Sequence, residues 1–317
     1  MRNSFFPAIL IAFSVMMSCR PGPKLTTIGY VQMTEDPVLN AAKSGLFQAL
    51  SDSGFIDGVN IKVLDNNAQG DISMITTIVQ SLISQNVNMV ITCSTPCMAV
   101  ATQLVRDVPV VFTVAFSPEQ IGMKGVPDNI FGVYDSIKAN EFADLMIECI
   151  PGLKCIGIPY NNAEPNAEFS VKVLSREFSG RGIEIVTAPV NSTNEIIQAG
   201  QYLAAKHIDA FVVSADNTVY LGLPVLSRLA AEKKIPLFVT DPLQTEKGAA
   251  IGLGGNYRSW GYQSGLKAIE ILKGRIPANN RIEPIPVYEL SVNLTTCAQH
   301  GLKIPEKVFA RATRIIN

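Results

Sequence analysis

Hydroxyl side chains stand where an apolar run gives way to a helical pattern. Ser94 and Thr95 follow the run 89–92, and Pro96 suits the first turn of a helix. Hydroxyls and unpaired backbone N–H groups at a helix N-terminus stabilise an anion. The segment therefore predicts a place for a carboxylate, although Ser94 or Thr95 could equally serve only as a helix cap.

Two acids follow apolar runs in the second half of the chain. Glu164 comes after the run 155–159, and Asp216 comes after the run 210–213. Two carboxylates that face one cleft can hold an ammonium group, but Asp216 also suits the N-cap of a helix. Side-chain amides would add donors and acceptors in the same layer: Asn161, Asn166 and Asn217.

Aromatic residues also stand at predicted strand ends. Phe116 follows the fourth strand and Tyr160 ends the fifth, so both are candidates for contact with an apolar ligand group. Aromatic pairs contribute about 0.5–1.5 kcal/mol beyond their buried area. The alternative for Phe116 is core packing. Trp260 opens a late helical pattern far from any strand end, so we expect it to pack or to lie on the surface.

Catalytic and metal-binding patterns are missing from the sequence. It has no Gly-x-Ser-x-Gly elbow and no phosphate-binding Gly-x-x-x-x-Gly-Lys loop. His207 and His300 have no partner at ligand spacing, so we expect no metal site. The sequence therefore argues against an enzyme.

The cysteines leave alternatives open. Cys93 and Cys97 bracket the Ser94 loop and are either reactive thiols near a helix start or small buried apolar residues. Cys149 and Cys155 flank a short connection, so a local disulfide is conceivable, and Cys297 is then unpaired.

Short β-branched runs alternate with amphipathic stretches, which is typical of α/β folds with parallel sheets. Strands are predicted at 27–31, 61–64, 89–92, 110–113, 155–159, 183–187, 210–213 and 237–239. Helices are predicted at 39–53, 72–84, 96–105, 139–149, 163–180, 194–205, 219–233 and 259–273.

The order of these units predicts two doubly wound lobes joined by a multi-crossing hinge. A crossing near 129–134 opens the second set of strands, the helix from 255 to 275 returns to the first lobe, and 287–293 crosses again. The expected lobes are 25–133 plus 254–285 and 134–253 plus 286–317. Ligands bind outside the carboxyl ends of parallel strands, so the facing lobes would form a cleft.

The N-terminus has the pattern of an export signal. Arg2 precedes an apolar stretch over 5–17 that is too short to span a bilayer, and Cys19 follows Ser18. We expect residues 1–18 to be a signal peptide, Cys19 to carry lipid that anchors the chain to a membrane, and 19–24 to be a tether. Plain secretion is the alternative, because Met16 is unusual for a lipobox. The formal net charge of −1 argues against nucleic-acid binding.

Several segments together carry a family resemblance. They are 28–32 (IGYVQ), 67–71 (NAQGD), 94–96 (STP), 160–161 (YN), 164–166 (EPN), 216–218 (DNT), 237–241 (LFVTD), 290–294 (LSVNL) and 301–305 (GLKIP). In this order they resemble the ABC-transporter substrate-binding lipoproteins that include tryptophan-binding receptors. The resemblance implies the type I periplasmic-binding-protein fold, a permease and an ATPase as partners, no cofactor and no chemistry. It also implies a small amino-acid-like ligand, with aromatic amino acids as the leading class.

The resemblance adds ligand candidates and alternatives. Gln32 and Glu35 near the end of the first strand join the expected site, as does Asp241, for which Pro242 makes a turn role the alternative. The helix after Pro96 departs from the family pattern because it reads Cys97-Met98-Ala99, without a polar side chain. A receptor that feeds a signalling partner shares this fold and is a second candidate. An enzyme of unknown chemistry is the third.

Overall fold

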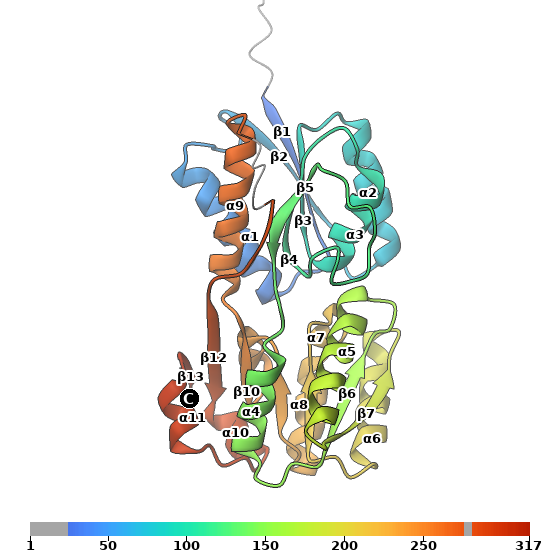
Figure 1. Ribbon diagram of the computed structural model, residues 1–317, viewed down its shortest axis with the longest axis vertical. Coiled ribbons are helices and arrows are strands. Elements are labelled where there is room, and N and C mark those ends of the chain that lie inside the picture. Colours follow the sequence, from blue (N-terminus) through green and yellow to red (C-terminus); the bar gives the residue numbers. More distant parts are fainter. Residues whose placement is uncertain (1–24, 276–280) are drawn as a thin grey trace, which may run out of the picture.

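The computed structural model describes residues 25–275 and 281–317. Two α/β lobes are stacked along the long axis of the molecule (Figure 1). The predicted signal peptide, the tether and Cys19 lie outside the described residues. Within the described ranges, the helices are too short or too polar to cross a membrane.

The first lobe contains a six-stranded sheet in the order β11-β5-β4-β3-β1-β2, and all its strand pairs are parallel. Its strands are β1 (Thr26–Gln32), β2 (Ile61–Asn67), β3 (Met89–Cys93), β4 (Val110–Ala115), β5 (Ile130–Tyr134) and β11 (Ile282–Pro284). Every residue of β3 is buried. Its continuous apolar run fits a strand that helices cover on both faces.

Helices cover both faces of this sheet. They are α1 (Pro37–Asp52) with α9 (Tyr257–Leu272), and α2 (Ile72–Ser84) with α3 (Thr95–Leu104) (Figure 1). The α1–α9 pair packs so closely that a Cβ added at Gly261 would lie 1.8 Å from the carbonyl oxygen of Ala42. Glycine at this position therefore lets the late helix return to the first lobe.

The second lobe contains a seven-stranded sheet in the order β13-β12-β10-β9-β8-β6-β7. Its strands are β6 (Cys155–Tyr160), β7 (Glu184–Pro189), β8 (Ala210–Val213), β9 (Leu237–Val239), β10 (Ile251–Gly255), β12 (Tyr288–Asn293) and β13 (Arg314–Ile316). Among the described strands, only β10 and β12 pair antiparallel. The antiparallel pair forms because β12 enters this lobe from the first one.

Two apolar cores flank the second sheet. One lies under α4 (Ala139–Cys149), α5 (Pro165–Gly180), α10 (Leu294–Gln299) and α11 (Glu306–Arg311). The other lies under α6 (Ile196–Ala204), α7 (Asn217–Leu221) and α8 (Leu223–Lys233). Short 3-10 helices, η1 (Thr193–Glu195) and η2 (Pro242–Lys247), complete the connections.

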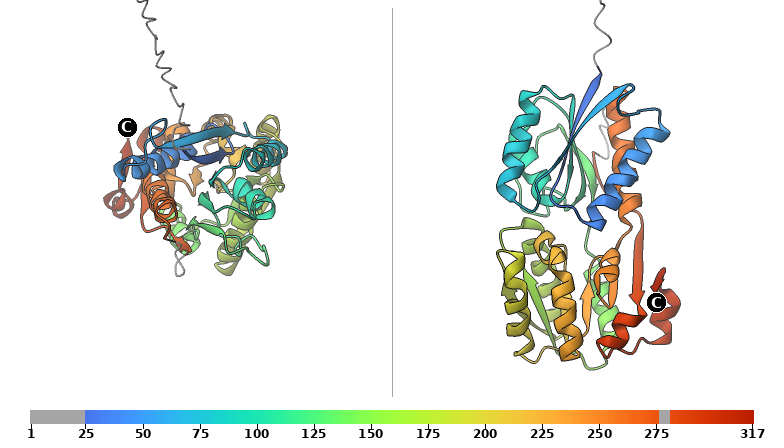
Figure 2. Two further views of the ribbon diagram at one scale, coloured as in Figure 1. Left: turned by 90° about the horizontal axis from the view of Figure 1, so that it is seen from above. Right: turned by 180° about the vertical axis from the view of Figure 1, so that it is seen from behind.

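The chain passes between the lobes after β5, after β10 and after β11 (Figure 2). Backbone hydrogen bonds tie these crossings together: Ile285 donates to Tyr134 at 2.9 Å, and Asn256 donates to Val287 at 3.0 Å. The crossings form a hinge, so the loops at the carboxyl ends of the two sheets face each other across a cleft.

Three element predictions were wrong. One is the crossing expected at 287–293, which from Tyr288 onward is strand β12 of the second sheet. The single helix expected at 219–233 is two helices, α7 and α8, separated at Gly222, because Pro224 starts a new helix in the first turn of α8. Residues 130–134, expected to form a crossing, are strand β5, which pairs with both β4 and β11. The chain leaves the first lobe only after this strand.

Candidate ligand-binding site between the lobes

A cavity lies between the lobes. The first lobe lines it with Thr34, Asp36, Val38, Leu39, Ser94, Thr95, Val114, Ala115, Phe116, Tyr257 and Trp260. The hinge contributes Asp135, and the second lobe contributes Asn166, Ala215, Asp216, Asn217 and Tyr220. A ligand in this cavity would contact both lobes.

The Ser94 loop is held at the start of α3. Ser94 has a φ angle of 116°, which is uncommon for a residue other than glycine, and its Oγ accepts from the Cys97 N–H at 3.5 Å. The Oγ1 of Thr95 accepts from the Phe116 N–H at 3.1 Å. Backbone strain of this kind is often found at binding sites. Both hydroxyls therefore cap or connect backbone and can still donate their own hydrogen to a ligand.

Aromatic rings form much of the cavity wall. Tyr257 and Trp260 stack with ring centroids 5.5 Å apart, and the Trp260 Nε1–H donates to the Val133 carbonyl at 2.7 Å. The packing predicted for Trp260 is thus confirmed, and its ring also lines the cavity. It reaches the cavity because α9 begins directly after a hinge crossing. Tyr220 is buried, and its hydroxyl has no hydrogen-bond partner among the described residues.

The two acids of the second lobe differ in role. Asp216 lines the cavity and caps α7, since its carboxylate accepts from the Val219 N–H at 2.8 Å and from the Asn161 N–H at 2.6 Å. Glu164 is fully buried outside the lining and accepts from Asn166, from the amide and backbone N–H groups of Asn217, and from Thr218. Burial is the main cause that raises the pKa of Asp216, and the negative charge of Glu164 raises it further.

Asn166 links these acids to the cavity. Its Nδ2 donates to Glu164 at 2.9 Å and to the Ala215 carbonyl at 2.8 Å. Its Oδ1 is buried and has no partner among the described residues. A buried acceptor without a donor costs free energy, so a donor on a bound ligand would satisfy it.

Two residues of the cavity lining make contacts between the lobes. Asp36 forms an ion pair with Lys247 of η2 and accepts from the Gln244 amide at 3.5 Å. Phe116 packs against Phe169 of α5 with ring centroids 4.7 Å apart. Both contacts join residues of different lobes, so the arrangement is a closed one.

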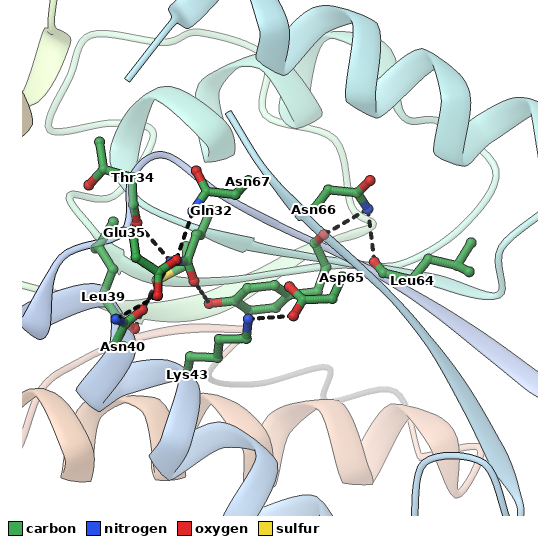
Figure 3. Close-up of polar contacts among 12 residues, drawn as sticks. Gln32, Thr34, Glu35, Leu39, Asn40, Lys43, Leu64, Asp65, Asn66 and Asn67 are labelled. Atoms are coloured by element: carbon green, nitrogen blue, oxygen red, sulfur yellow. Dashed lines mark hydrogen bonds and ion pairs between the residues drawn. The ribbon is translucent and has the colours of Figure 1, made fainter. Parts of the chain in front are cut away.

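Gln32 and Glu35 lie outside the lining and hold the loop that follows β1 (Figure 3). The Gln32 amide donates to the Thr34 carbonyl at 2.7 Å and to Asn40 Oδ1 at 3.1 Å. Glu35 accepts from Asn40 at 3.0 Å and from Asn67 at 3.1 Å. This network positions Thr34 and Asp36, which face the cavity.

Some of the other residues expected at the site line the cavity, and some do not. The structure brings Ser94, Thr95, Phe116, Asn166, Asp216 and Asn217 to the cavity and leaves Tyr160, Asn161 and Asp241 out of its lining. Asp241 caps η2 by accepting from the Leu243 N–H at 2.9 Å, which is the turn role that Pro242 suggested.

Sequence analysis missed Thr34, Asp36, Asp135, Tyr220 and Tyr257. One signal could have found Asp36, which precedes Pro37 and caps α1 at the carboxyl end of a strand. Asp135 gave no comparable signal, because it lies in the hinge. Tyr288, from another crossing, donates its hydroxyl to Asp135 at 2.8 Å, and burial raises the pKa of Asp135 to about 6.

The five cysteines among the described residues are free thiols, so the conceivable Cys149–Cys155 disulfide is not formed, and Cys93 and Cys97 are not bonded to each other. Burial raises the pKa of Cys93 and of Cys97 to about 12, which makes both unreactive. The described residues contain no cluster of side chains that could hold a metal ion.

Comparison with known proteins agrees with this geometry. The model of the ABC transporter substrate-binding protein family matches residues 27–316. The chain belongs to this family. Its members are substrate-binding proteins, so the chain captures a small molecule for an ABC transporter, and its two lobes have the type I periplasmic-binding-protein fold.

Individual relatives bind aromatic amino acids. The chain is 30% identical over 277 residues to a tyrosine-binding protein of Clostridioides difficile, covering 86% of this chain and 80% of that protein. A Streptococcus pneumoniae structure in complex with L-Trp has a TM-score of 0.85 at 25% identity, covering 92% of this chain and all of that one. A ligand-free, open Clostridium difficile substrate-binding protein has a TM-score of 0.68 at 29% identity, with the same coverage. The lobes described here are thus arranged more like those of the ligand complex.

Proposed function

We propose that the protein captures a free aromatic amino acid in the closed cavity and presents it to its permease. The observation that carries the proposal is a cavity whose wall combines four aromatic rings with three carboxyl groups and an unsatisfied acceptor. The rings are Phe116, Tyr220, Tyr257 and Trp260. The binding of tyrosine and tryptophan by relatives supports this ligand class.

The polar ends of the ligand have separate places. The α-ammonium group would bind the Asp216 carboxylate and Asn166 Oδ1, which are acceptors. The α-carboxylate would bind the Ser94 and Thr95 hydroxyls at the start of α3. Because the two places belong to different lobes, the ligand stabilises the closed form more than the open one. The protein performs no chemistry in this role.

The protein is exported and anchored by lipid on Cys19 in this proposal, with the two lobes facing the outside of the membrane. The leader pattern before Cys19 supports this location.

A thermal-shift screen tests the ligand. The chain from residue 20 onward is mixed with amino acids, indoles, peptides, sugars and nucleosides. L-Trp or L-Tyr at a hundredfold excess over its dissociation constant should stabilise the protein by about 2.7 kcal/mol. A melting temperature that rises only with sugars or nucleosides would refute the proposal.

A further inference from the structure

We propose that this receptor selects its ligand through the amino group and that the α-carboxylate is dispensable, so that aromatic amines are bound and deaminated aromatic acids are rejected. The inference rests on the proposed aromatic ligand and assigns the charge that this ligand must carry.

The charges around the cavity are one-sided. The lining contains three carboxyl groups, from Asp36, Asp135 and Asp216, and no lysine, arginine or histidine among the described residues. Two further acids, Glu164 and Asp241, are fully buried close to the lining acids. The charge of Glu164 raises the pKa of Asp216, and that of Asp36 raises the pKa of Asp241. Two cations lie near these acids outside the lining, and both are already paired: Lys247 with Asp36, and Lys138, which lies near Asp135, with Glu141. The surroundings therefore favour a cation over an anion.

The acceptors for an ammonium group are built in. Asp216 is 2% exposed, and its two carboxylate oxygens accept one backbone N–H each, which leaves lone pairs for a ligand. Asn166 is 4% exposed, and the contacts of its amide nitrogen with Glu164 and Ala215 fix its side chain. The unsatisfied Oδ1 of Asn166 therefore waits for a donor, which an ammonium group supplies and a carboxylate does not.

The place for a carboxylate is poorly equipped in comparison. Pro96 lacks an N–H group in the first turn of α3, and the N–H of Cys97 is directed to Ser94 Oγ. The Thr95 hydroxyl oxygen is engaged by the Phe116 N–H. The donors left for an anion are neutral ones. They include the two hydroxyl hydrogens and the Thr95 N–H at the start of α3, and the unpartnered Tyr220 hydroxyl elsewhere in the lining. These donors can hydrogen-bond a carboxylate of the ligand, but none of them carries a positive charge to pair with it.

The inference is tested by calorimetry at pH 8. The compounds are tryptophan, tryptamine and indole-3-propionate, together with tyrosine and tyramine. Loss of the amino group should weaken binding by about 100-fold or more, as expected when a buried charged partner is removed. Loss of the carboxylate should weaken binding by less than about tenfold. The inference would be overturned if the affinity for indole-3-propionate were within tenfold of that for tryptophan. It would also be overturned if tryptamine bound 100-fold more weakly than tryptophan.

The same titrations separate this inference from the proposed function. If tryptophan or tyrosine binds but the preference for the amine is missing, only the charge selection fails. If none of the five aromatic compounds binds, the aromatic ligand class fails and the inference fails with it.

A charge-neutral variant links the selection to the cavity. In Asp135→Asn, the amide oxygen can still accept a hydrogen bond from the Tyr288 hydroxyl. The hydrogen bond between the hinge crossings is therefore kept, while one negative charge of the cavity lining is lost. The affinity ratio of tryptamine to indole-3-propionate should fall by about fivefold or more, since one carboxylate fewer faces the ligand. Asp65→Asn is the matched control, because Asp65 pairs with Lys43 outside the cavity lining, and its ratio should equal that of wild type. An unchanged ratio in Asp135→Asn would overturn the electrostatic basis of the selection.

Discussion

Lys247 forms an ion pair that exists only when the lobes are closed. Its ammonium group meets Asp36 across the cleft, and the two side chains are 22% and 6% exposed. Lys247→Met removes the charge and keeps most of the aliphatic stem, so the packing of η2 is largely preserved. In this variant, Asp36 would still accept a hydrogen bond from the Val38 N–H at 2.8 Å and the longer one from the Gln244 amide.

The magnitude follows from the burial of this pair. Exposed pairs contribute about 0–1 kcal/mol, and breaking a fully buried pair costs about 3–5 kcal/mol. A mostly buried pair with a remaining backbone donor falls between these limits, at about 2 kcal/mol. The affinity of a receptor that must close equals its intrinsic affinity scaled by the closed fraction. We therefore expect ligand binding to weaken by about 30-fold.

Two measurements check this prediction. Calorimetry gives the affinity for L-Trp or L-Tyr, and urea unfolding gives the stability of the ligand-free protein, which should change by less than about 0.5 kcal/mol because the open form lacks the contact. Lys43→Met is the matched control, since Lys43 pairs with Asp65 at 2.5 Å within the first lobe and both side chains are partly exposed. Its affinity should equal that of wild type. An unchanged affinity in Lys247→Met, or a loss that appears instead in the unfolding of the ligand-free protein, would refute the reasoning.

Further predictions concern single groups. Asp216→Asn should keep the cap on Val219 but lose the acceptor for the Asn161 N–H; we expect about 1–3 kcal/mol lower stability and about 2–5 kcal/mol weaker ligand binding, and equal affinity in calorimetry would leave Asp216 as a cap alone. Burial, followed by Lys234, lowers the pKa of His300 to about 4, so the folded state keeps the ring neutral. The unfolded chain takes up this proton below pH 6.5; the stability is therefore present above pH 6.5 and is lost as the pH falls towards 4, by up to about 3 kcal/mol. Urea unfolding of His300→Gln should show a shallower loss over that range than wild type, and identical slopes would contradict the assignment. Cys19→Ala should abolish lipid attachment without changing ligand affinity, and a wild-type protein found wholly in the aqueous phase of a detergent extraction would show that Cys19 carries no lipid.

The sequence by itself determined the class of fold. Apolar runs such as Met89–Cys93 and Ala210–Val213 form strands where their pattern predicts them, and helices Ile72–Ser84 and Ala139–Cys149 have the predicted bounds. These elements are local in origin, because the periodicity of apolar residues and the capping residues fix them before any tertiary contact forms. The ordered segments that resemble substrate-binding lipoproteins also indicated the family.

Strand-end positions gave part of the candidate site for a similar reason. Ser94, Thr95 and Asp216 follow parallel strands directly, and the carboxyl ends of such strands meet at one edge of each sheet. Glu164 follows this rule too, but its carboxylate turned away from the cavity to bind the start of α7. Which acid of a pair faces a ligand depends on the donors that surround it, and these come from distant parts of the chain.

Only the tertiary structure decided the other residues of the cavity. Asp135 lies in a hinge crossing, Trp260 and Tyr257 stand at the start of a helix that returns to the first lobe, and Tyr220 belongs to a helix whose interruption was not predicted. None of them follows a strand in the pattern that sequence analysis uses. The contact of Asp36 with Lys247 joins residues 211 positions apart and depends on the closure of the lobes. Periodicity reports which face of an element is buried, whereas the approach of two lobes across a hinge is set by long-range packing that no local pattern encodes.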